Sequence, residues 1–205
     1  KNSNLLADFG YTKGYENVTS KKQAGDKSHF FGKFTKNFSD DDSSNSFLDI
    51  KIQNVSNPKY LKLYKIESNL VDYNVDTLEN SLDFSHEDDQ IFLGLNASIY
   101  ETLKDDYNDK YEYILPEVTV DKNLLSSNIF GSLDLQSNFR VHTYDTNKSS
   151  TFFINNFDWE SKELNHKSGI KGNFLGNLKN INYETRNLDL YKTNSTSELF
   201  GAIGY

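Results

Sequence analysis

Residues 111–161 read YEYILPEVTVDKNLLSSNIFGSLDLQSNFRVHTYDTNKSSTFFINNFDWES, and two kinds of residue alternate in the second half of this stretch. The apolar residues of one parity are Leu133, Leu135, Phe139 and Val141. The polar residues of the other parity are Asp134, Gln136, Asn138, Arg140 and His142. A period of two places successive side chains on opposite faces of a strand. The stretch therefore predicts a strand with one apolar and one polar face.

The length of this strand indicates its environment. Strands of soluble proteins are usually about 5–6 residues long, whereas a tilted strand that crosses a bilayer needs about 9–11. The alternation over 132–142 extends for about the length of a bilayer-crossing strand. We therefore expect an all-β fold, an antiparallel up-and-down transmembrane β-barrel. In this barrel the apolar set that contains Leu133 would face lipid, and the polar set that contains Asp134 would line the lumen.

Other parts of the chain alternate in the same way. We expect strands over 5–12, 29–38, 48–53, 60–68, 91–100 and 151–159, with shorter strands after 170. The strands 48–53 and 60–68 are expected to form a hairpin around the turn at Asn57 and Pro58. The segment 71–90 is less regular, and we favour a strand there. The count is about eleven or twelve strands, and residues 1–205 are expected to be part of one barrel domain.

Composition limits the class of protein. Hydrophobic residues make up 36% of the chain and mean hydropathy is −0.71, values typical of a very polar or partly disordered protein. An aromatic content of 14% argues against disorder. A barrel with a wet lumen reconciles the two, because only alternate strand residues need be apolar. The net charge of −8 opposes nucleic-acid binding, and the sequence has no run of about 18 apolar residues for a membrane helix.

The sequence gives little sign of catalysis or metal binding. It has no cysteine, and its four histidines are scattered. The acidic runs 86–89 and 40–42 have ligands that suit a hard cation, but each is also typical of a solvated turn. Glu112 and Glu117 have opposite parity, so we expect them on different faces, whereas Asp158 and Glu160 share one. We expect no enzyme activity, catalytic residue, cofactor or metal.

Two groups of residues have a role in the barrel hypothesis. Arg140 is suited to a phosphate or a carboxylate, or else pairs with an acid in the lumen. Five aromatic residues lie near predicted strand ends, where an aromatic girdle would stand at the membrane surfaces. They are Tyr111, Tyr113, Tyr144, Trp159 and Tyr191.

The order of these segments resembles the outer-membrane lipopolysaccharide-assembly protein family (LptD, formerly OstA or Imp). The resembling segments are IYETL at 99–103, YEYILPEVTV at 111–120, the Gly-led strand 130–144 and NNFDWES at 155–161. YLKLYKI at 60–66 and KNINYETRNLDLYK at 179–192 are also similar to the family's barrel.

The resemblance implies a location in the cell outer membrane and a role in lipopolysaccharide transport. The barrel would receive lipopolysaccharide from periplasmic bridge components and insert it in the outer leaflet, with a plug lipoprotein as partner. The chain has no methionine, and we expect a fragment that lacks the family's periplasmic domain and terminal strands. Two alternatives stay open: another outer-membrane barrel, such as a porin or receptor, and a soluble secreted β-sandwich that binds a ligand.

Overall fold

The computed structural model describes residues 2–14, 25–38, 43–165, 168–192 and 195–205, which form strands and one short helix. The ten long strands are β1 (Ser3–Thr12), β2 (Lys27–Asn37), β3 (Ser44–Val55), β4 (Thr77–Asp88), β5 (Ile91–Thr102), β6 (Tyr111–Ser127), β7 (Gly131–Tyr144), β8 (Ser149–Glu160), β11 (Leu175–Arg186) and β12 (Thr196–Gly204). The short elements are β9 (Leu164–Asn165), β10 (Lys171–Gly172) and the helix α1 (Tyr60–Tyr64). Among the described residues, no helix is long and apolar enough to cross a membrane.

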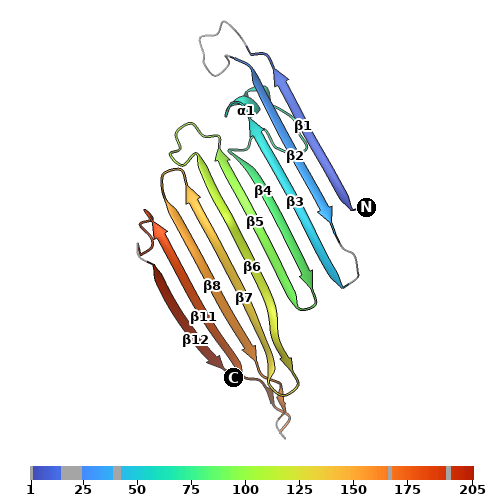
Figure 1. Cartoon of the computed structure of the whole chain (residues 1–205), viewed down its shortest axis with the longest axis vertical. Coiled ribbons are helices and arrows are strands. Elements are labelled where there is room, and N and C mark those ends of the chain that lie inside the picture. Colours follow the sequence, from blue (N-terminus) through green and yellow to red (C-terminus); the bar gives the residue numbers. More distant parts are fainter. Residues whose placement is uncertain (1, 15–24, 39–42, 166–167, 193–194) are drawn as a thin grey trace.

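The ten long strands form one sheet in the order β1-β2-β3-β4-β5-β6-β7-β8-β11-β12, as Figure 1 shows. Every neighbouring pair is antiparallel. The strands β9 and β10 pair only with each other, in the connection between β8 and β11. The expected all-β, antiparallel up-and-down arrangement is confirmed. The sheet is open, with β1 and β12 at its edges, and closure into a barrel stays a prediction.

The sheet is strongly staggered, so that β1 and β12 lie far apart along the strand direction (Figure 1). The stagger can be followed along a row of paired residues. From Phe200 on β12 the row passes through Lys179, Asn156, Gln136, Asp121, Phe92, Glu87 and Asn45. The last pair of the β2–β3 ladder at this end is Asn37 with Phe47. The row at Asn45 lies beyond this pair, so it does not continue through β2 to β1. A stagger of this kind is the shear that a sheet needs if its tilted strands are to close.

The register divides the side chains of the sheet into two faces. The apolar face carries, in the middle of β1 to β6, Leu5, Ala7, Phe9, Phe30, Gly32, Phe34, Leu48, Ile50, Ile52, Leu82, Phe84, Leu93, Leu95, Ala97, Ile99, Val118 and Val120. The other, the polar face, carries mainly acids, amides, hydroxyls and lysines. Many side chains of the apolar face are open to the surroundings: Leu95 is 39% exposed and Ile52 44% exposed.

The buried core lies under residues 56–76, which we call the strap. The strap contains α1 and packs on the polar face, because His29 and Phe31 are 5% and 0% exposed whereas Phe30 between them is 42% exposed. The core cluster is Phe31, Val55, Tyr60, Leu61, Val71, Leu78 and Leu103. The strap thus supplies the apolar cover for the part of the polar face nearest to it.

The expected strand over 60–68, and with it the hairpin to 48–53, is wrong. Residues 60–64 form the helix α1, which ends at Lys65 in the left-handed conformation, with φ of 47°. The letters YLKLYKI alternate, but Tyr60, Leu61 and Tyr64 also have the spacing of one helical face. Tyr60 and Leu61 are 2% and 1% exposed, so burial against the sheet selects the helix.

A bulge in β6 corrects the prediction for Glu112 and Glu117. The pairing of β6 with β7 shifts between Ile114 and Glu117, on either side of Pro116. Proline has no N–H for the ladder and is confined to such irregularities within a sheet. The shift changes the parity, so that Glu112 and Glu117 pair with Tyr144 and Arg140 and both lie on the polar face.

Candidate functional site: the polar face of the sheet

The register of β7 separates the two predicted sets of residues. Asp134, Gln136, Asn138, Arg140 and His142 lie on the polar face. Leu133, Leu135, Phe139 and Val141 lie on the apolar face, in pairs such as Val118 with Phe139 and Leu135 with Phe157. The alternation read from the sequence is thus present in the structure. The assignment of the two faces to lumen and lipid stays a prediction.

Polar side chains on this face hydrogen-bond to one another from strand to strand. On β6 and β7, Asn123 Nδ2 donates to Asp134 Oδ1 at 2.7 Å and Asn138 Nδ2 donates to Thr119 Oγ1 at 3.1 Å. On β8 and β11, Asn177 Nδ2 donates to Asn156 Oδ1 at 2.7 Å. Amides and carboxylates paired in this way give a polar surface that hydrogen-bonds to itself across the strands.

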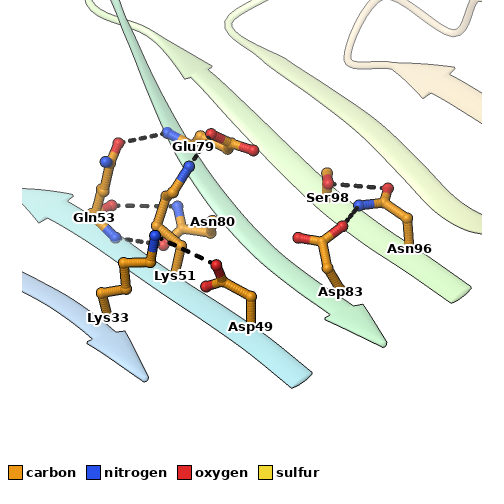
Figure 2. Close-up of polar contacts among 9 residues, drawn as sticks. All are labelled: Lys33, Asp49, Lys51, Gln53, Glu79, Asn80, Asp83, Asn96 and Ser98. Atoms are coloured by element: carbon orange, nitrogen blue, oxygen red, sulfur yellow. Dashed lines mark hydrogen bonds and ion pairs between the residues drawn. The ribbon is translucent and has the colours of Figure 1, made fainter. Parts of the chain in front are cut away.

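The same kind of network continues over β2 to β5, which Figure 2 shows in close-up. Lys33 Nζ lies 3.3 Å from Asp49 Oδ2, and Lys51 Nζ lies 2.5 Å from Glu79 Oε2. On β5, Ser98 Oγ donates to Asn96 Oδ1 at 3.0 Å, and Asn96 in turn donates to Asp83 on β4. Charge is therefore balanced locally across the strands of this half of the polar face.

Arg140 differs from Lys33 and Lys51 of the polar face, because it forms no ion pair with any described residue. Its pairing partners in the ladders are Glu117 on β6 and Phe152 on β8. Its Nε atom is buried without a hydrogen-bond partner, and Glu117 instead accepts from Asn138 Nδ2 at 3.4 Å. A guanidinium is the side-chain group best suited to bind a phosphate or a carboxylate.

Aromatic rings lie beside Arg140 on the polar face. The ring of Phe152 stacks on that of Tyr183, with centroids 5.6 Å apart, and Tyr191 packs edge-on to Phe152 at 5.6 Å. Tyr144 packs at 4.4 Å against His142, whose Nε2 atom lies 2.6 Å from Glu112 Oε1. Sequence reasoning missed this cluster, although the parity of Phe152 with Asp158 would have placed it on the polar face.

The five aromatic residues expected to form a girdle do not all lie on one face of the sheet. Tyr111, Tyr113 and Trp159 have apolar-face parity. Tyr144 and Tyr191 lie on the polar side instead, where the first pairs with Glu112 and the second packs on Phe152. Position near a strand end does not determine the face, and for these two residues the girdle prediction is wrong.

The acidic turns have no metal-binding cluster within the described part of the chain. In the run 86–89, Asp88 Oδ1 accepts the backbone N–H groups of Gln90 and Ile91 at 2.8 and 2.9 Å, which closes the turn between β4 and β5. His86 Nδ1 lies 2.8 Å from Ser46 Oγ. The second acidic run, 40–42, lies outside the described residues.

Ion pairs join the connections at the end of the sheet where the strap lies. Lys59 of the strap pairs with Asp105, and Lys104 Nζ lies 3.6 Å from Asp76 Oδ2. The hydrogen bond and charge of Lys62 lower the pKa of Asp76. In the next connection, a hydrogen bond from the Thr146 hydroxyl, helped by Lys148, lowers the pKa of Asp109. The strap is thus fastened to the connection 103–110, and that connection to the turn 145–148.

We compared the chain with known proteins. No protein-family model matches it, and no curated protein sequence matches it.

Proposed function

We propose that this chain forms part of the wall of an outer-membrane β-barrel whose polar face lines a lumen. The observation that carries the proposal is the exposed apolar face, whose central positions on β1 to β6 are mostly apolar while the opposite face is mainly polar. In water such a surface would be an aggregation or interaction site, whereas in a bilayer it is the ordinary outer surface of a barrel. The stagger of the strands adds support, because closure requires it.

The two ends of the sheet differ in the way that outer-membrane barrels do. At one end the connections are 56–76, 103–110, 145–148 and 187–195, and at the other the turns 89–90 and 128–130 are short. Outer-membrane barrels have short periplasmic turns and longer extracellular loops. We therefore orient the strap toward the cell exterior. The connection 161–174, which contains β9 and β10, is the long one at the opposite end.

One test of the proposal needs no mutation, because Trp159 is the single tryptophan of the chain. It lies on the apolar face and is 36% exposed. Lipids brominated on the acyl chain should quench its emission in reconstituted membranes. Single cysteines at Leu133, Leu135, Phe139 and Val141 should react with a lipid-phase label, whereas cysteines at Asp134, Gln136 and Arg140 should not. Equal labelling of both sets, or an unquenched Trp159 in a protein that is soluble without detergent, would contradict the proposal.

We further propose that the amphiphile handled by this barrel is lipopolysaccharide. This step rests on the sequence resemblance to the assembly family. It is supported by Arg140, whose guanidinium forms no ion pair with the described residues and suits a phosphorylated head group, and by the aromatic rings beside it, which suit sugars. The head group would pass along the polar face while the acyl chains leave toward the membrane. A plug lipoprotein and periplasmic bridge components would be the partners.

A photo-crosslinking amino acid at Arg140, Asn138 or Gln136 tests this finer proposal in cells. The expected result is a lipopolysaccharide adduct at these positions. A matched position on the same face but far from Arg140 is Asp49 on β3, where fewer adducts are expected. If no lipopolysaccharide adduct forms at any of the three β7 positions while the lipid-phase labelling is positive, the barrel proposal stands and the proposal that lipopolysaccharide is the substrate is wrong.

One observation favours a second candidate function, a diffusion channel. The strap folds onto the polar face, where it would narrow a lumen. A channel predicts ion conductance in planar bilayers that rises when the strap is shortened. An assembly protein with a plug in its lumen predicts low conductance from the complex with that plug.

A further inference from the structure

The charged residues of the central strands lie mostly on one face of the sheet and have mostly one sign. The polar face of β4 to β8 carries a set of carboxylates that we call the acidic stripe. Its members are Glu79, Asp83, Glu87, Glu112, Glu117, Asp121, Asp134, Asp158 and Glu160. Within these five strands, which the structure describes throughout, Arg140 is the one lysine or arginine on that face. The stripe therefore has a large excess of negative charge.

The apolar face of the same strands has few acids, lysines or arginines, and they lie near the ends of β4 and β5. Asp88 is the last residue of β4, and Glu101 is the last but one of β5. Lys122 pairs with Ile91, the first residue of β5. The charge of the central strands is therefore concentrated on the side that we propose to line the lumen.

Amides, which are neutral, hold several carboxylates of the stripe. Asn123 Nδ2 donates to Asp134 Oδ1, and Asn177 Nδ2 donates to Asp158 Oδ1, both at 2.7 Å. A neutral donor satisfies the carboxylate oxygen and leaves its charge uncancelled. The lysines of β2 and β3, by contrast, form ion pairs with Asp49 and Glu79. The excess of negative charge therefore grows from the β3 side of the polar face toward β8.

Two carboxylates of the stripe lie directly opposite each other. Asp134 and Asp158 are a pair of the β7–β8 ladder. At such positions Cβ atoms are about 4.5–5.5 Å apart, and like charges destabilise the sheet. Asp83 faces Asp49 in the same way, but there Lys33 Nζ lies 3.3 Å from Asp49 Oδ2. Mobile cations beside Asp134 and Asp158 would screen their repulsion, so the folded sheet favours a local excess of cations at this place.

We infer that the acidic stripe makes the proposed lumen selective for cations, so that small cations collect along it and small anions are excluded. A water-filled path lined by one sign of charge, with walls of low dielectric constant, focuses the field and concentrates ions of the opposite sign. The inference rests on the proposed function, because it assumes that the polar face lines a lumen. It goes beyond that function in naming the class of small ion that the lumen admits.

Arg140 is the exception within this field. It pairs with Glu117 in the β6–β7 ladder and with Phe152 in the β7–β8 ladder. A phosphorylated head group would meet an attractive charge at Arg140 and would need its own counter-cations elsewhere along the stripe. Small free anions have no such series of attractive positions to follow.

Thiol reagents of opposite charge test the inference on the full-length protein in its native membrane. The sequence has no cysteine, so Gln136→Cys carries a single thiol. This position is exposed, pairs with Asp121 and shares its face with Asp134 and Asp158. The rate with trimethylammonium-ethyl methanethiosulfonate, divided by the rate with the sulfonatoethyl reagent and corrected for a free small thiol, should be about tenfold or more at low salt.

Thr35→Cys is the matched control position. It lies on the polar face of β2, opposite Asp49 and two residues from Lys33, where the charges balance. The same ratio of rates should be close to one there. Equal ratios at the two positions, or a preference for the anionic reagent at Gln136→Cys, would overturn the inference.

Neutralising the neighbours shows whether the stripe causes the preference. Asp121→Asn and Asp158→Asn should each lower the ratio at Gln136→Cys, and the two together should lower it further. Glu184→Gln removes a charge from the apolar face of β11 and should leave the ratio unchanged. In the unneutralised variant, 1 M salt should bring the ratio close to one, because the Debye length is then about 3 Å. A ratio that responds neither to these substitutions nor to salt would contradict the inference.

A lipid-phase label separates failure of the selectivity from failure of the proposed function. Leu95→Cys on the apolar face of β5 should react with it. If Leu95→Cys is labelled and the ratio at Gln136→Cys is close to one, the cation selectivity is wrong and the barrel wall stands. If Leu95→Cys is not labelled, the proposed function is wrong and the inference falls with it.

Discussion

The attachment of the strap to the sheet leads to a quantitative prediction at Leu61. This side chain is 1% exposed and belongs to the core cluster. Leu61→Ala removes three carbon atoms, a loss of about 2.4 kcal/mol at about 0.8 kcal/mol for each buried CH₂ group. The remaining cavity raises the loss to about 3 kcal/mol. Because the cluster joins the strap to the sheet, we expect local release of the strap while the ladders of β5 to β8 persist.

Hydrogen exchange measures this release directly. The amides of Leu63 and Ile66 donate to the carbonyls of Lys59 and Leu61 at 2.9 and 3.1 Å, and a loss of about 3 kcal/mol lowers their protection by about 100-fold or more. Leu63→Ala is the matched control, since Leu63 lies on the same helix but is 39% exposed. Its effect should be below about 1 kcal/mol. The reasoning is refuted if both variants lower protection equally, or if the β5–β8 ladders open with the strap.

Two other predictions concern the same end of the molecule. Tyr60→Phe removes the hydroxyl that lies 3.3 Å from His29 Nδ1 and should lower protection of the strap by about 1 kcal/mol, or about fivefold in exchange rate; an unchanged rate would show that this contact contributes nothing. Asp109 has a lowered pKa in the folded state, so its contribution to the stability of the 103–110 connection is fully present above the ordinary value near 3.8. That contribution should disappear as pH falls from this value through the lower folded pKa. In the Asp109→Asn variant, the hydrogen-exchange rates of residues 103–110 should no longer change over this pH range. If the pH dependence persists in the variant, another titrating group causes it.

Alternation was a reliable guide wherever a strand stays regular along its length. The pattern of β7 places every predicted apolar and polar residue on the expected face, because the extra residues of the β6–β7 ladder lie on β6 and β7 keeps the period of two. At Pro116 the period is broken by a residue without an N–H group. Glu112 and Glu117 were therefore assigned to different faces, although the structure places them on the same one. The presence of proline in a strand could have signalled the bulge, but not the number of residues that it skips.

The strap and the aromatic cluster could not be predicted for a different reason. Both depend on contacts between segments distant in sequence: Tyr60 is buried against His29, and Tyr191 packs on Phe152. In YLKLYKI the helical and extended patterns overlap, so local sequence leaves the choice to tertiary packing. Tyr191 follows β11 in a connection, where no periodicity indicates a face.

The position of the core on the polar side is itself an argument about environment. In a protein folded in water, an available amphipathic segment would cover the apolar face of the sheet, since burial of that surface gives the largest gain. Here the strap packs against the polar face, and it brings Tyr60, Leu61 and Val71 to Phe31 there. The apolar face at Phe30 and Ile52 is left 42% and 44% exposed. This arrangement supports the proposed barrel wall, in which lipid would cover the apolar face and the polar face, partly covered by the strap, would face a water-filled lumen.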